Sequence, residues 1–172
     1  MPHFDNYYYN NDADLDKNFY KKYDIDKSKK ILFFVTKGPS TFQFNPNIAM
    51  LISKNINNGN IKNAHLITRI HPLFYKLNDD TNEYEFSSAL KVFKELEKKY
   101  DCLSVDYPKI TSMKQNFEMN KNEQSHLKNL IIKSDVIINV YSTLNIEGAI
   151  FCLLYTSPSP RDRQKWRMPG CA

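Results

Sequence analysis

Residues 134–151, SDVIINVYSTLNIEGAIF, are the stretch from which the rest of the chain can be interpreted. The apolar run at its centre predicts a buried strand over 135–141, of the kind found in parallel sheets covered on both faces. A polar turn at Ser142 and Thr143 then leads into a predicted helix. Because a helix begins with unbonded backbone N–H groups, such a junction favours an anionic ligand such as phosphate. An ordinary strand–helix crossover with a capping Ser or Thr also explains these residues.

Glu147 lies about one turn into that helix, where its carboxylate could accept hydrogen bonds from ribose hydroxyls. A solvated glutamate on a surface helix is the plainer interpretation, and the spacing does not choose between them.

The residues before this stretch alternate between apolar runs typical of strands and amphipathic runs typical of helices. The expected order is helix 14–23, strand 31–36, helix 45–56, strand 64–70, helix 86–100, strand 102–105 and helix 123–133. Such alternation predicts an α/β, Rossmann-like parallel sheet of about four strands with helices on both faces. With Pro46 in the first turn, Asn45 is expected to cap its helix.

Three polar clusters follow predicted strands, at the sheet edge where ligands bind in such folds. The first is the loop with Lys37, Gly38 and Ser40, whose backbone N–H groups could bind a phosphate or a sugar. It matches neither a Walker loop nor GxGxxG, so a simple turn remains open. The second is His71, a possible base or cation beside phosphate, or simply a loop residue before Pro72. The third is the 142–147 segment already described.

Metal and nucleophile chemistry have little support in the sequence. His3, His65 and His126 have no metal-ligand spacing with His71 or Cys102, so no metal site is predicted. No GxSxG motif is present either. Cys102 precedes an apolar residue and is expected to be a small buried hydrophobe.

The last residues, 152–172, are best set aside. The segment 152–162, CLLYTSPSPRD, resembles the translation of a transposase sequencing adapter, which makes 152–172 an expected artefactual and disordered tail. The whole chain carries 24 Lys and Arg against 19 Asp and Glu, but without this tail the counts are 20 and 18. The remaining excess of two positive charges does not favour nucleic acid as a partner. Losing the sequence beyond Phe151 is also expected to leave the last strand's outer edge unpaired.

The amino-terminal residues show no secretory signal, and no apolar run is long enough to cross a bilayer. A cytoplasmic protein is therefore expected, with association to a membrane face left open.

The motif RIHP at 69–72, followed by the 134–151 stretch, resembles the carboxyl-terminal domain of GT-B-type glycosyltransferases. The nearest groups are bacterial surface-polysaccharide transferases and CDP-glycerol glycerophosphotransferase-like proteins. The resemblance implies that residues 1–151 form a truncated nucleotide-sugar-binding domain, of which 1–28 are linker and first helix. It implies a nucleotide-diphosphate sugar as substrate, no separate cofactor, and an amino-terminal acceptor domain that is missing here.

Site roles also follow from the resemblance. The turn at Ser142 and Thr143 would face the donor diphosphate, Glu147 would bind ribose, and His71 would lie beside the phosphates or reaction centre. One departure is the turn itself, NVYST at 139–143, which differs from the Asp-Tyr-Ser-Ser of glycerophosphotransferases and argues for a sugar donor.

Three interpretations therefore remain open. The first is the donor-binding half of a glycosyltransferase in surface polysaccharide or glycoconjugate synthesis, inactive alone. The second is a nucleotide-sugar epimerase or a CDP-glycerol glycerophosphotransferase fragment, which would use a similar fold and site. The third is a non-catalytic α/β binding module.

Overall fold

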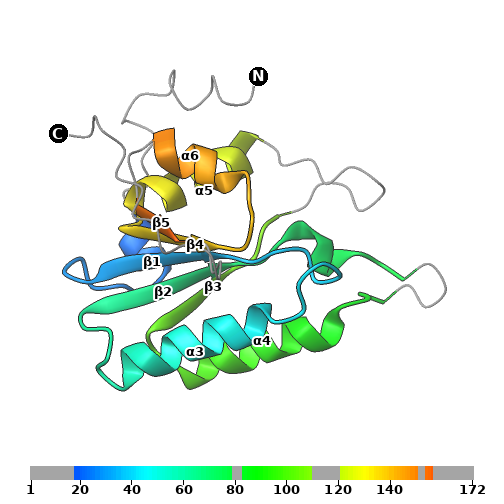
Figure 1. Ribbon diagram of the computed structural model, residues 1–172, viewed down its shortest axis with the longest axis horizontal. Coiled ribbons are helices and arrows are strands. Elements are labelled where there is room, and N and C mark those ends of the chain that lie inside the picture. Colours follow the sequence, from blue (N-terminus) through cyan, green and yellow to red (C-terminus); the bar gives the residue numbers. More distant parts are fainter. Residues whose placement is uncertain (1–17, 79–82, 110–120, 151–153, 157–172) are drawn as a thin grey trace.

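Five parallel strands form one sheet in the order β3-β2-β1-β4-β5 (Figure 1). The protein is described from a computed structural model over residues 18–78, 83–109, 121–150 and 154–156. The strands are β1 (Lys30–Val35), β2 (Ala64–Arg69), β3 (Leu103–Asp106), β4 (Val136–Asn139) and β5 (Leu154–Thr156). Their order and parallel pairing confirm the predicted Rossmann-like α/β fold.

Helices cover both faces of the sheet (Figure 1). One face carries α3 (Asn45–Asn57) and α4 (Ser87–Lys99), with the 3₁₀ turn η2 (Pro72–Tyr75) at its edge. The other carries α5 (Lys121–Lys133) and α6 (Leu144–Ile150), and the short α2 (Phe19–Lys22) packs into the same apolar core as α5.

The central strand β1 shows why its sequence is apolar throughout. Successive side chains of a strand point to opposite faces of the sheet. Ile31 and Phe33 accordingly belong to the core beneath α5, whereas Leu32 and Phe34 face the core beneath α3 and α4. A strand buried on both sides has no position for a solvated residue, as the continuous run at 31–35 predicted.

Strand β5 lies within the tail that the sequence analysis set aside. Leu154–Thr156 pairs with Val136–Ile138 of β4, so the expectation of an unpaired outer edge on β4 was wrong. An open strand edge presents unpaired N–H and C=O groups, and Leu-Tyr-Thr is a β-prone segment able to satisfy them. Residues 151–153 and 157–172 lie outside the described residues.

The predicted element boundaries hold to within about two residues for most elements. Of the first expected helix, 14–23, the described part contains only α2, and residues 14–17 lie outside the described ranges. Within the described part of the chain, no helix combines the length and apolarity needed to cross a membrane.

Candidate functional site

The carboxyl ends of β1 and β4 form the topological switch point of the sheet. Strands β2 and β3 are added in turn on one side of β1, whereas β4, the next strand in the chain, pairs with the other side of β1. The final residues of β1 and β4, Val35 and Asn139, are partners in the parallel register. In open α/β sheets the connections on either side of such a point diverge and leave a crevice for a ligand.

Lys37 connects the two sides of this switch point. Its ammonium donates a hydrogen bond of 2.9 Å to the backbone oxygen of Tyr141, in the turn between β4 and α6. Tyr141 has a φ of 48°, a left-handed conformation that is uncommon for a residue other than glycine. The Lys37 ammonium is thus held between the ends of β1 and β4, on a carbonyl that an anion could replace.

The loop that carries Lys37 is fixed by Asn45. The Asn45 side chain accepts from the Lys37 N–H and donates to the Lys37 carbonyl oxygen, both at 2.9 Å, and also donates to the carbonyl of Phe42. Asn45 is fully buried and is the first residue of α3, whose N-cap is Phe44. The prediction that Asn45 caps the helix was therefore wrong, because its amide serves the two backbone groups of Lys37 instead.

Ser142 and Thr143 follow Tyr141 directly. The Ser142 hydroxyl oxygen accepts from the N–H of Leu144 at 3.2 Å, so Ser142 caps α6 and keeps its hydroxyl proton available to a ligand. Thr143 is exposed, and Glu147 is buried one turn along. A β-carbon on Gly148 would lie 2.9 Å from Ile137 Cδ1, so α6 sits directly on β4 at this point.

His71 lies beside the Lys37 loop, across β1 from the β4 turn. A β-carbon built on Gly38 would lie 3.9 Å from two atoms of the His71 ring, a distance of ordinary contact. The ring Nδ1 accepts from the Leu73 N–H at 3.1 Å, which places the proton of the neutral ring on Nε2. Burial and the nearby charge of Lys37 both lower the pKa of His71, so the ring is neutral at pH 7.

Ser40 is separated from this group. It is exposed and lines a different hollow, between the β1–α3 loop and the start of α4. The structure thus brings together Lys37, Gly38, His71 and the turn before α6, whereas Ser40 faces elsewhere.

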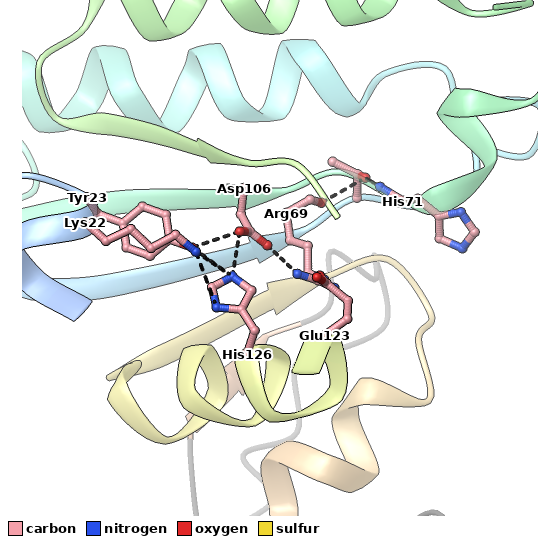
Figure 2. A network of polar contacts seen from close by, with 8 residues as sticks. Lys22, Tyr23, Arg69, His71, Asp106, Glu123 and His126 are labelled. Atoms are coloured by element: carbon pink, nitrogen blue, oxygen red, sulfur yellow. Dashed lines mark hydrogen bonds and ion pairs between the residues drawn. The ribbon is translucent and has the colours of Figure 1, made fainter. Parts of the chain in front are cut away.

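A buried polar network under the same sheet edge was missed in the sequence analysis (Figure 2). The Arg69 guanidinium, at the end of β2, donates to Asp106 at the end of β3 and to Glu123 Oε1 of α5 at 2.8 Å. All three side chains are at least nine-tenths buried. Such a fork between two carboxylates is the geometry that arginine favours.

Asp106 is the centre of this network. Its Oδ1 accepts from the Tyr23 hydroxyl at 2.8 Å and lies 2.8 Å from His126 Nε2. Burial alone would raise the pKa of Asp106, but the His126 contact and the Arg69 charge outweigh it and lower the pKa to about 2. The same burial, together with Asp106, raises the pKa of the Tyr23 hydroxyl.

The network also reaches His71 through the backbone (Figure 2). Thr36 donates to the Arg69 carbonyl oxygen from its N–H at 3.1 Å and from its hydroxyl at 3.0 Å. The Thr36 hydroxyl oxygen in turn accepts from the His71 N–H at 2.7 Å. The ion pairs on the Arg69 side chain therefore anchor the backbone from which His71 projects.

One signal in the sequence could have indicated this network. Arg69 lies near the end of the mainly apolar segment 64–70, which predicts a buried strand, and an arginine buried in such a strand requires acidic partners. Glu123 and His126 are spaced three apart on a helix and so share one face. Among the described residues, no group of three or more His, Cys, Asp and Glu is arranged to hold a metal ion.

Comparisons with known proteins add a fold relationship. No family model matches the chain, and no curated protein matches it by sequence. Among solved structures, the chain is similar to the S. aureus MnaA–UDP co-structure, with a TM-score of 0.57 and 14% identity. The match covers 87% of this chain and 32% of that one, so this chain spans about a third of the neighbour's length. The likeness supports the Rossmann-like fold.

We expect Arg69→Met to lower the free energy of unfolding by about 3–5 kcal/mol, because it leaves two buried carboxylates without their cation. Lys30→Met is the matched control, since Lys30 pairs with Asp135 at 2.9 Å but is 68% exposed. Breaking that surface pair should cost much less than breaking the buried network, because solvent screens an exposed ion pair. Urea unfolding monitored by circular dichroism measures both, and equal losses would contradict the importance assigned to the network.

We expect His71 to titrate below the ordinary histidine value of 6.5, in the direction set by burial and Lys37. Lys37→Met should raise this pKa part of the way, because it removes the charge and leaves the burial. Lys54→Met, an exposed lysine on α3, should leave it unchanged. NMR titration of the imidazole signals tests this, and a pKa above 6.5 in the unmodified chain would contradict the geometry.

Proposed function

We propose that the chain is the donor-binding half of a nucleotide-sugar-dependent glycosyltransferase, with the donor diphosphate at the switch point between β1 and β4. The observation that carries the proposal is the Lys37 ammonium, which spans that point and rests on the Tyr141 carbonyl at 2.9 Å. A lysine held by one neutral acceptor can exchange it for a phosphate oxygen at a gain in charge-assisted bonding.

The neighbouring groups suit a diphosphate in complementary ways. The Ser142 hydroxyl has a proton to donate, because its oxygen already accepts from Leu144. The neutral His71 ring carries its proton on Nε2 and can donate it in a hydrogen bond without adding a charge. Gly38 presents its backbone without a side chain where His71 and Leu73 approach. These donors would stabilise the negative charge that develops on a departing diphosphate.

Asn139 adds an acceptor at the same edge. It is fully buried, and its side-chain oxygen is one of the few buried polar atoms of the described residues without a hydrogen-bond partner. A buried acceptor left unpaired is costly, so a ligand hydroxyl or amide that reaches it would gain affinity. Glu147, one turn along α6, is the second candidate acceptor and is assigned to the ribose.

The complete reaction would transfer a glycosyl group to an acceptor. A hydroxyl oxygen of the acceptor would bond to the anomeric carbon while the bond from that carbon to the diphosphate oxygen breaks. The bonding electrons leave with the diphosphate, and the hydroxyl proton passes to a base on the missing half. Since this chain spans about a third of its structural neighbour, we assign it binding of the donor and no turnover alone.

The neighbour's co-structure with UDP makes a uridine diphosphate donor the first candidate. The proposed setting, surface polysaccharide or glycoconjugate synthesis, follows from the sequence resemblance of the RIHP and 134–151 motifs. An epimerase would use the same nucleotide site, so it shares the predictions below and differs in needing no acceptor.

In isothermal titration calorimetry, we expect UDP to bind the chain. Lys37→Met should raise the dissociation constant by about tenfold or more, because it removes one charge-assisted hydrogen bond to phosphate. Lys54→Met should bind as the unmodified chain does. UMP, which lacks the second phosphate, should bind more weakly and respond less to Lys37→Met. Absence of binding by UDP and CDP alike would refute the proposal, and clear preference for CDP would favour the glycerophosphotransferase alternative.

The ribose contact has its own test. We expect UDP to bind more tightly than 2′-deoxy-UDP, because Glu147 accepts a hydrogen bond from a ribose hydroxyl. Glu147→Gln should reduce that preference while both nucleotides still respond to Lys37→Met. If the variant keeps the full preference for UDP, Glu147 is not the ribose acceptor.

A further inference from the structure

A cavity of about 620 Å³ lies between the β1–α3 loop and the start of α4, outside the site described above. Its walls come from loop residues 39–44, from Phe74 of η2, and from Phe86, Ser88 and Ala89 at the beginning of α4. This volume is within the range of about 300–1,000 Å³ typical of small-molecule sites.

The chemistry of the walls is aromatic and uncharged. Phe42 and Phe44 meet edge to face at 5.8 Å, as do Phe74 and Phe86 at 6.3 Å. Phe44 is 56% exposed, a large apolar side chain left in solvent beside the opening. The polar lining groups are hydroxyls and an amide, those of Ser40, Thr41, Gln43 and Ser88. None of the lining residues carries a charge.

We propose that this cavity binds an uncharged saccharide ring. A pyranose presents C–H groups on its faces and hydroxyls around its rim, and so needs apolar surface and neutral hydrogen-bonding groups together. The cavity offers both. A phosphate or nucleotide is disfavoured there, because a buried anion requires a cationic or strongly donating partner.

The cavity adjoins the proposed donor site through two shared segments. Lys37 and Gly38 run directly into the loop that lines it, and Phe74 lies three residues after His71. The two segments touch, since a β-carbon on Gly38 would meet Leu73 Cδ1 at 2.9 Å. His71 is not among the residues that line the cavity, so a sugar bound there would lie beyond the contact between Gly38 and Leu73. The identity of that sugar as the acceptor rests on the proposed transferase function.

The test uses the full ¹⁵N-labelled chain with N-acetylglucosamine and methyl β-D-glucopyranoside as probes. We expect both to shift the amide signals of loop residues 40–44 and of 86–89, with dissociation constants of about 1–10 mM. Gln43→Ala, at an exposed position, and Phe42→Ala should each weaken binding by about fivefold or more. Leu51→Ala, at an exposed apolar position on α3 outside the cavity, is the control and should bind normally.

The outcomes are distinct from those of the nucleotide titration. Absence of shifts in the cavity, or shifts that neither Gln43→Ala nor Phe42→Ala reduces, would overturn the inference even if UDP binds. Saccharide binding without UDP binding would uphold the cavity and remove its assignment to an acceptor. Absence of binding by the saccharides and by UDP would reject both proposals.

Discussion

The pairing of β1 with β4 is the constraint on which the rest of the structure depends. The two strands are about 100 residues apart in the chain, yet their parallel register sets Val35 directly opposite Asn139. Only this pairing lets the Lys37 side chain reach the carbonyl of Tyr141. The candidate site thus exists only because the sheet places β1 next to β4. Taken alone, each of these strands is an ordinary strand followed by a turn.

The buried ion pairs of Arg69 are the second feature that holds the site in place. Burying Arg69, Asp106 and Glu123 removes three charges from water, a cost that their mutual attraction offsets only because the hydrogen-bonding geometry is nearly complete. The result is a fixed connection among β2, β3 and α5 at the carboxyl edge of the sheet, the edge at which open α/β sheets generally bind ligands. The Thr36 hydroxyl also holds the His71 backbone in place, because it donates to the Arg69 carbonyl oxygen and accepts from the His71 N–H.

The strands could be predicted because the signal is local. A run such as Ile31 to Val35 is apolar at every position, and only a strand covered on both faces needs that pattern. Parallel order then placed Lys37, His71 and Ser142 at one edge without any knowledge of contacts. The network was not predictable in the same way, because Tyr23, Arg69, Asp106 and Glu123 come from four separate elements. The true role of Asn45 was missed because an asparagine that caps a helix and one that fixes a loop look alike in sequence. The sequence also does not show toward which side of the loop the Ser40 side chain points.

The central claim is that nucleotide phosphates occupy the switch point between β1 and β4. A crystal structure of the chain with UDP tests it most directly. We predict phosphate oxygens within hydrogen-bonding distance of Lys37 Nζ and the Ser142 hydroxyl, with the His71 ring beside them. Phosphates bound at any other edge or face of the sheet, with Lys37 still on the Tyr141 carbonyl, would contradict the account.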